Sequence, residues 1–183
     1  MKTSTKFISL LAFALLLGCL PTVNPVYTEN DLIFDEAILG VWNQDGGGSS
    51  WVFSKKDEKS YLLQFTDNKS LTGQFVAHLA EIKGTKYLDL FPEKPEEQSG
   101  FYAAHMVPLH TIYRVVQTQP ELKLAGIDFK WLKEYLDEHP GALQMLTIND
   151  RKIVSSSTKE LQAFVIEHKE RFTAEIILQR PAP

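Results

Sequence analysis

A two-residue period of apolar side chains over residues 51–91 constrains the fold more than any other feature. Trp51 and Phe53 are two positions apart, and Tyr61, Leu63 and Phe65 follow at the same spacing. Successive side chains of a strand point to opposite faces, so this spacing predicts strands with one buried face. Charged or polar turns at 55–59, 67–69 and 83–85 separate the runs. Residues 51–91 are therefore expected to form an antiparallel meander joined by tight hairpins.

Further strand signals follow at 105–116, 122–127, 142–148, 151–154 and 174–178. Two helices interrupt them in the C-terminal half. The first is expected over 129–139 and ends at Pro140-Gly141, and the second begins after Ser157, which forms a capping box with Glu160. The predicted class is mainly β, a meander that closes into a barrel, because closure removes exposed strand edges. A two-sheet sandwich is the competing architecture.

The first 18 residues have the parts of a secretory signal. Lys2 and Lys6 precede an apolar run of 11 residues, 7–17, that only Ser9 interrupts. A bilayer needs about 20 apolar residues, so this run is too short to be a permanent anchor. We therefore expect residues 1–18 to be a signal peptide.

Leu16-Leu17-Gly18-Cys19 resembles the lipobox of bacterial lipoproteins. The resemblance implies cleavage before Cys19 and a diacylglyceryl group on its sulfur, with the membrane as partner through that lipid. An ordinary signal peptide that contains a cysteine is the alternative. The expected organisation is a signal peptide at 1–18, a lipidated tether at 19–31, and one barrel-like domain at 32–183.

Cys19 is the only cysteine of the chain, which excludes disulfides and cysteine-based metal or redox sites. Removal of Lys2 and Lys6 from 19 basic side chains leaves 17 against 23 acidic ones, a formal charge of −6. Nucleic-acid-binding surfaces are cationic, so no nucleic-acid partner is expected. No motif for a cofactor or metal is present, and His-Glu-x-x-His is absent.

Four polar residues are candidates for a binding or catalytic cluster. His78 and His110 could converge across the sheet on the face that carries Arg114, and Asp89 could be their buried partner. Ordinary surface or hydrogen-bonded side chains are the alternative for all four. A hydrolase would also need a nucleophile, and the sequence does not identify one.

Aromatic residues are concentrated in the first strands. They have two possible places in a barrel, as the lining of a cavity for an apolar ligand or as the filling of a solid core. The candidates for ligand contact are Trp51, Phe53, Phe65 and Phe75.

Gly40-Val41-Trp42 resembles the Gly-x-Trp start of lipocalins and related calycin barrels. The resemblance implies that Trp42 plugs one end of the barrel and that a late basic residue, here Arg180, packs on it. The sequence departs from the family because a helix lies between late strands and the Thr-Asp-Tyr type motif is missing.

A second resemblance, to a group of small uncharacterised bacterial proteins that are often lipoproteins, covers most of the mature chain. It is carried by the segments 73–79, 87–90, 107–115, 131–132 and 156–164. It implies a folded domain and a lipid anchor. It does not imply an established activity.

The function expected from the sequence is a non-enzymatic, membrane-anchored binder of a small apolar ligand. A solid-core interaction or assembly protein of the cell envelope is the second hypothesis, and a hydrolase-type enzyme that uses the His/Arg/Asp cluster is the third. Leu20 after the cysteine, in place of aspartate, favours the periplasmic face of the outer membrane in a Gram-negative cell.

Overall fold

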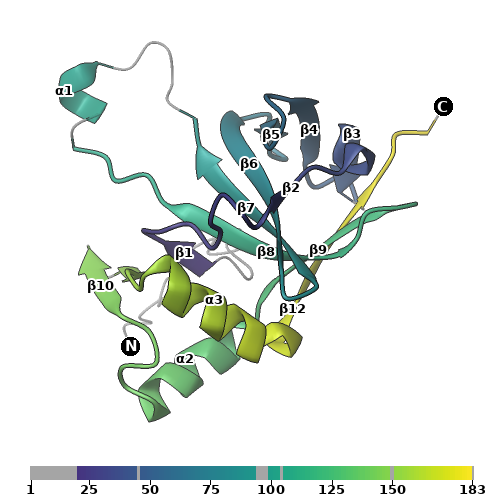
Figure 1. The fold of residues 1–183 in the computed structure, drawn as a ribbon. Helices are drawn as coiled ribbons and strands as arrows, with labels where there is room; N and C mark the ends of the chain where they lie inside the picture. The colour runs from purple at the N-terminus through teal and green to yellow at the C-terminus, as the bar shows by residue number, and fades with distance from the viewer. Residues whose placement is uncertain (1–19, 45, 94–98, 104, 149–150, 183) are drawn as a thin grey trace, which may run out of the picture.

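Eight antiparallel strands close into a barrel in the computed structural model (Figure 1). The structure describes residues 20–44, 46–93, 99–103, 105–148 and 151–182. The order around the ring is β8-β7-β6-β5-β4-β3-β12-β9, and pairing of β9 with β8 closes it. The ring strands are β3 (Gly40–Gln44), β4 (Ser50–Lys55), β5 (Tyr61–Thr66), β6 (Thr72–Ile82), β7 (Thr85–Pro92), β8 (His110–Gln117), β9 (Leu122–Ile127) and β12 (Phe172–Gln179). The predicted barrel is confirmed, and the sandwich alternative is wrong.

Three short strands extend the sheet beyond the ring. They are β1 (Leu20–Thr22), β11 (Arg151–Val154) and β10 (Met145–Ile148), attached in that order to β8. A further two-residue strand, β2 (Leu32–Ile33), pairs with β6. The first half of β8 pairs with β1 and its second half with β9. Strand β8 is therefore the point where the closed barrel and the extension separate.

The helices begin and end near the predicted residues. Helix α2 (Phe129–Glu138) has Asp128 as its N-cap, and α3 (Thr158–Glu167) begins after Ser157 with the expected capping box. The Ser157 hydroxyl accepts from the Glu160 amide, and the Glu160 carboxylate accepts from the Ser157 amide. The structure also contains a short α1 (Gly100–Ala103) and the 3-10 helices η1 (Glu36–Ile38) and η2 (Lys169–Arg171).

The structure corrects two predictions. Residues 20–31 do not form a separate tether, because Leu20 and Val26 are 1% and 0% exposed and β1 pairs with β8 and β11. The strand expected from 105 begins only at His110, after α1. Strand β1 has three residues and its partners lie about 90 and 130 positions later, so no local period marks it. Cys19 lies outside the described residues.

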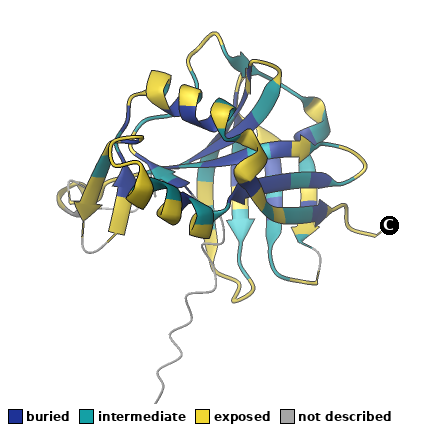
Figure 2. Cartoon of the chain, turned by 90° about the horizontal axis from the view of Figure 1, so that it is seen from below, coloured by how far each residue is buried: buried dark blue, intermediate teal, exposed yellow. Residues whose placement is uncertain are grey.

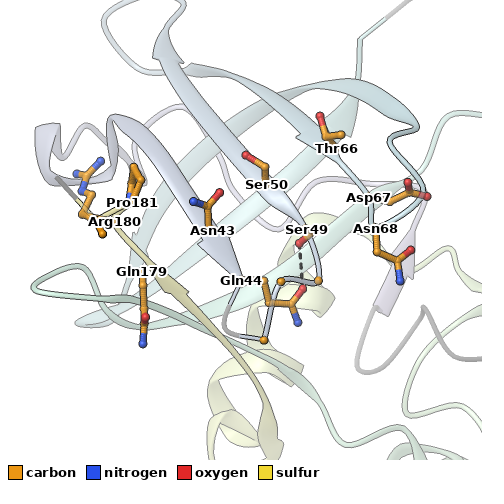
Figure 3. A pocket seen from close by; sticks show the side chains of 14 residues that line it. Asn43, Gln44, Ser49, Ser50, Thr66, Asp67, Asn68, Gln179, Arg180 and Pro181 are labelled. Carbon is orange, nitrogen blue, oxygen red and sulfur yellow. Dashed lines mark hydrogen bonds between the residues drawn. The ribbon is translucent and has the colours of Figure 1, made fainter.

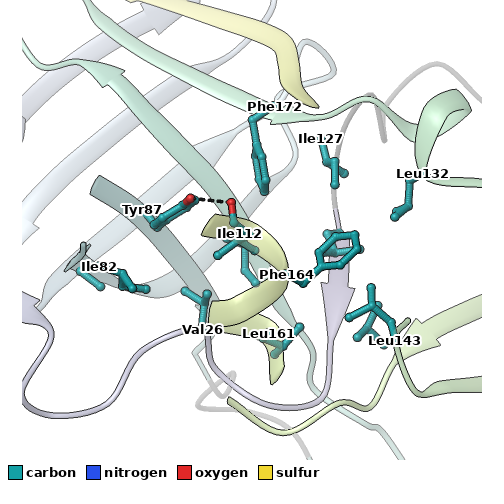
Figure 4. Close-up of a cluster of buried hydrophobic side chains, with 14 of the residues drawn as sticks. Val26, Ile82, Tyr87, Ile112, Ile127, Leu132, Leu143, Leu161, Phe164 and Phe172 are labelled. Atoms are coloured by element: carbon teal, nitrogen blue, oxygen red, sulfur yellow. Dashed lines mark hydrogen bonds between the residues drawn. The ribbon is translucent and has the colours of Figure 1, made fainter. Parts of the chain in front are cut away.

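Two hydrophobic cores lie on the two sides of one sheet wall. Inside the barrel Trp42, Phe53 and Leu63 are almost wholly buried. Outside it, α2 and α3 cover the sheet, and Leu161, Phe164 and neighbouring apolar residues of α3 pack on β7–β9 (Figures 2 and 4). Alternation along β7 sends Leu88 inward and Tyr87 outward. The hydroxyl of Tyr87 donates to the Val165 carbonyl at 2.9 Å and ties the wall to α3.

Trp42 and Arg180 form the contact that the lipocalin resemblance implies. The guanidinium lies 3.6 Å from the ring centroid of Trp42, which is fully buried. It also donates to the carbonyls of Leu39 and Ala37 at 2.7 and 3.0 Å. Gly40 leaves room for this group, since a Cβ there would stand 2.5 Å from Arg180 Nη1, and its φ of +107° disfavours any other residue. The fold is compatible with a lipocalin-like barrel.

Gly40→Ala is expected to lower the free energy of unfolding by about 2–4 kcal/mol, because it adds a clash with Arg180 to the strain of a positive φ. Urea unfolding followed by tryptophan fluorescence measures the change. Gly84→Ala is the control, since Gly84 also has a positive φ, +76°, but open space around it. It should cost only about 1 kcal/mol. Equal losses at the two glycines would contradict a steric role for Arg180.

Candidate functional site

Three of the four predicted polar residues converge on the outer face of the barrel. His78 on β6 stands directly opposite Asp89 on β7. Asp89 is fully buried, and its Oδ1 lies 2.6 Å from Nδ1 of His110 on β8. The distance is that of a hydrogen bond between the imidazole and the carboxylate. Strands β6, β7 and β8 are neighbours in the sheet, and the three residues share its outer face because each lies two positions from an outward residue, Ala80, Tyr87 or Ile112.

The remaining oxygen of Asp89 binds the segment that the sequence assigned to a tether. Oδ2 accepts from the backbone N–H of Val26 at 3.0 Å. The next residue, Tyr27, places its hydroxyl 3.0 Å from His78 Nδ1, with the two rings 4.7 Å apart. Tyr27, His78, Asp89 and His110, called the polar latch from here on, therefore hold residues 26 and 27 against β6–β8.

Burial sets the protonation of Tyr27 and His78 in the polar latch. Desolvation, followed by the negative charges of Asp89 and Glu29, raises the pKa of the Tyr27 hydroxyl above its ordinary value. Desolvation also lowers the pKa of His78, although the charge of Asp89 acts in the opposite direction. A protonated hydroxyl and a neutral imidazole fit one hydrogen bond in which Tyr27 donates to His78.

Arg114 does not join the latch. Its guanidinium donates to the carbonyl of Lys169 at 2.9 Å and lies 3.6 Å from the Glu170 carboxylate, both in η2. The four-residue cluster that the enzyme hypothesis required is therefore not formed. Within the described residues no hydroxyl or thiol hydrogen-bonds to His110, and the contacts of Asp89 serve to connect segments of the fold.

The aromatic candidates fill the barrel. Trp51 and Phe53 are 5% and 2% exposed, and Phe65 meets Trp51 edge to face at 5.2 Å. Phe75 packs against the same core from its margin. Tyr113 and Tyr61 close around Trp51 and Phe53 from other strands. Of the two arrangements left open by the sequence, the filled core is the one that forms.

A shallow depression of about 580 Å³ lies beside the β3–β4 hairpin (Figure 3). Amide and hydroxyl groups dominate its walls, and Ser49 donates to the Gln44 side chain at 2.9 Å. The Gly46-Gly47 turn has positive φ at both residues. A second depression, of about 430 Å³, is bordered by His78 and by acidic residues including Glu29 and Asp57. Most of the residues that line the two depressions are charged or polar.

An aromatic cluster that the sequence indicated only in part lies between α2 and α3. His168, the C-cap of α3, lies 5.0 Å from Trp131, 4.7 Å from Tyr135 and 4.7 Å from Phe164, measured between ring centroids. Its Nε2 is buried and has no hydrogen-bond partner. Burial lowers the pKa of His168, which keeps the ring neutral in this setting.

The described residues contain no group of three or more histidine, cysteine or acidic side chains placed to hold a metal ion. Nor does any helix in that part of the chain have the length and hydropathy to span a bilayer. No protein-family model, curated protein or solved structure matches the chain. Its likeness to lipocalins therefore stands on the ring order and the Trp42–Arg180 contact.

Asp89→Ala is expected to lower the free energy of unfolding by about 3 kcal/mol, because it leaves the buried Val26 N–H and His110 without their acceptor. Arg114→Ala should cost about 1 kcal/mol or less, since its ion pair reaches a solvent-exposed glutamate. Chemical denaturation of both variants gives the comparison. Similar losses would show that the latch is no more important to the fold than a surface contact.

Stability is expected to fall as the pH drops from about 7.5 to about 5, since His78 and His168 have a lowered pKa when folded and about 6.5 when unfolded. The unfolded chain then binds more protons than the folded one, so the stabilisation exists above that range and is lost below it. His78→Gln and His168→Gln should each flatten the pH dependence of the denaturation midpoint. His105→Gln, at an exposed site outside both clusters, is the control. An unchanged slope in both test variants would contradict this assignment.

Proposed function

We propose that this chain is a lipid-anchored protein of the bacterial envelope that works through contacts of its outer surface with another envelope component. The observation that carries the functional class is the filled barrel, in which Trp51, Phe53 and Leu63 occupy the space that a ligand would need. The lipobox at residues 16–19 supports the location. The barrel is the rigid body that presents the interacting surface.

The proposal agrees with the second resemblance in the sequence, to a group of small bacterial lipoproteins that have no assigned reaction. The hypothesis of a small apolar ligand loses support, because such a ligand would have to displace tightly packed aromatic rings. Displacing Trp51 or Phe53 would forfeit about 3–5 kcal/mol of core packing each, by analogy with truncating such side chains. The depression beside Gln44 and Ser49 has polar walls, so it does not offer an alternative site for an apolar ligand.

Native mass spectrometry of the protein purified from its own envelope tests the functional class. We expect the mass of the lipidated chain with no additional small molecule, and cross-linking in intact cells should yield a defined protein partner. A stoichiometric apolar compound that survives purification would overturn the interaction hypothesis and restore the ligand-binding one.

Cys19→Ala is expected to abolish lipid modification, because the thioether needs the cysteine sulfur. Intact mass of the wild-type protein should correspond to a chain that begins at Cys19 plus acyl chains, each buried methylene of which contributes about 0.8 kcal/mol to anchoring. Ser4→Ala, which changes the signal segment but leaves residues 16–19 intact, is the control and should be lipidated normally. A wild-type N-terminus other than Cys19, without lipid, would contradict the proposed location.

A further inference from the structure

The proposed lipid attachment site is one peptide bond from a folded strand. Leu20 opens β1, and its side chain is buried in the outer core. Consecutive Cα atoms are about 3.8 Å apart, so a lipid on Cys19 would have no linker to separate it from the sheet. Such a lipid would hold the β1–β11–β10 extension against the membrane surface. At the margin of the sheet, β1 and β10 lie far from β3 (Figure 1).

Strand register brings the β10–β11 hairpin to the same end of the extension as Leu20. Thr22 pairs in parallel with Val154, so Leu20 is level with Lys152, two residues earlier in each strand. In the antiparallel hairpin Lys152 pairs with Thr147, and the pair beyond it is Arg151 with Ile148. The tip of the hairpin therefore lies beside the start of β1.

One face of the extension carries exposed apolar side chains. Alternation places Thr22 and Val154 on the face that meets the outer core, and both are fully buried. On the hairpin the opposite face carries Leu146 and Ile148, which are 45% and 41% exposed, together with Arg151 and the buried Ile153. Val23, which is 36% exposed, follows β1. At the hairpin tip, Ile148 is the last apolar residue of that opposite face.

The tip is also cationic in a chain that is otherwise acidic. Arg151 and Lys152 are both exposed, and neither forms an ion pair with another described residue. Asp150 lies outside the described residues, and residues 148–152 keep a formal charge of +1 when it is counted. The mature chain as a whole has a formal charge of −6, from 17 basic and 23 acidic side chains. Basic and apolar residues together suit the interface of an anionic bilayer.

We propose that the end of the β10–β11 hairpin at the Ile148–Arg151 pair, with Lys152 next to it on the other face, is a membrane-contact surface. It rests on the proposed lipidation of Cys19. This surface contacts the headgroup and upper acyl region of the membrane that holds the lipid. Contact there fixes the orientation of the barrel and turns the β3–β4 side of the ring away from the bilayer.

The free edge of β10 offers a second kind of contact, since an edge strand can pair with a strand of another chain. The lipid surface is favoured because Cys19, the proposed lipid attachment site, directly precedes β1 and because Arg151 and Lys152 are basic. Strand addition would draw on the backbone of 145–148 and would not require the cations. The experiment below distinguishes contact with a lipid surface from pairing with a strand of another chain.

Site-specific labelling of the full-length lipoprotein tests the proposal. Cys19 is the only cysteine and its sulfur is blocked by lipid, so Ile148→Cys supplies a single free thiol for a fluorophore. Val41→Cys on β3 is the matched control, since Val41 is a strand residue with 40% exposure on the far side of the ring. Both proteins are incorporated into vesicles of phosphatidylethanolamine and phosphatidylglycerol that contain brominated acyl chains, and flotation confirms attachment.

We expect at least about a twofold loss of fluorescence at position 148 and none at 41, because interfacial residues reach the boundary of the acyl region. Flotation without quenching at 148 would overturn the membrane-contact surface and leave the anchor intact. Failure to float would refute the anchor itself. Protection of the label at 148 from soluble iodide in the absence of vesicles would show a paired β10 edge, which also overturns the proposal.

A charge-reversal variant tests the cations separately from the anchor. Arg151→Glu/Lys152→Glu, combined with the label at 148, should reduce the quenching, since each basic residue near an anionic surface favours contact about fivefold. Lys130→Glu/Lys133→Glu makes the same change in charge on exposed positions of α2 and should leave the quenching unchanged. Equal effects of the two pairs would overturn the role of the hairpin tip.

Discussion

The rest of the structure depends on burial of both faces of the wall formed by β6–β9. Leu88 and Leu124 point into the barrel, while Tyr87 and Ala125 point toward the helices. A sheet with two apolar faces is stable in water only when both are covered, and each Å² of apolar surface removed from water contributes about 25 cal/mol. Closure of the ring covers one face, and α2, α3 and the N-terminal segment cover the other (Figure 2).

The same wall explains why the polar latch exists and where it lies. Asp89 occupies an outward position of β7, between inward Leu88 and Leu90, at the margin of the outer core. A buried carboxylate is costly without partners, and the bonds to Val26 and His110 supply them. The latch thus converts a polar position on an apolar wall into an attachment for residues 26 and 27. This places Asp89 and His110 among the structural elements of the fold.

Attachment of the N-terminal segment also determines how an anchored molecule would sit. A flexible linker would let the barrel rotate freely above the bilayer, and its contacts would average over all orientations. Here Leu20 and Val26 are part of the outer core, and β1 and the β10–β11 hairpin belong to one sheet. Lipidation at the first residue would then present the same side of the barrel to other envelope proteins.

Local pattern in the sequence was sufficient for the meander, for the positions of both long helices and for the capping box of α3, whereas the contact of Arg180 with Trp42 was implied by the resemblance to lipocalins. These features depend on neighbours along the chain or on a motif of a few residues. The tertiary structure alone decided that β1 joins the sheet, that Asp89 binds Val26 63 positions away, and that Arg114 turns to η2. It also decided that Trp51 and Phe53 fill the barrel, since aromatic alternation is the same for a lined cavity and a packed core. The physical reason is that packing and pairing between distant segments depend on ring closure and strand register, which no local period encodes.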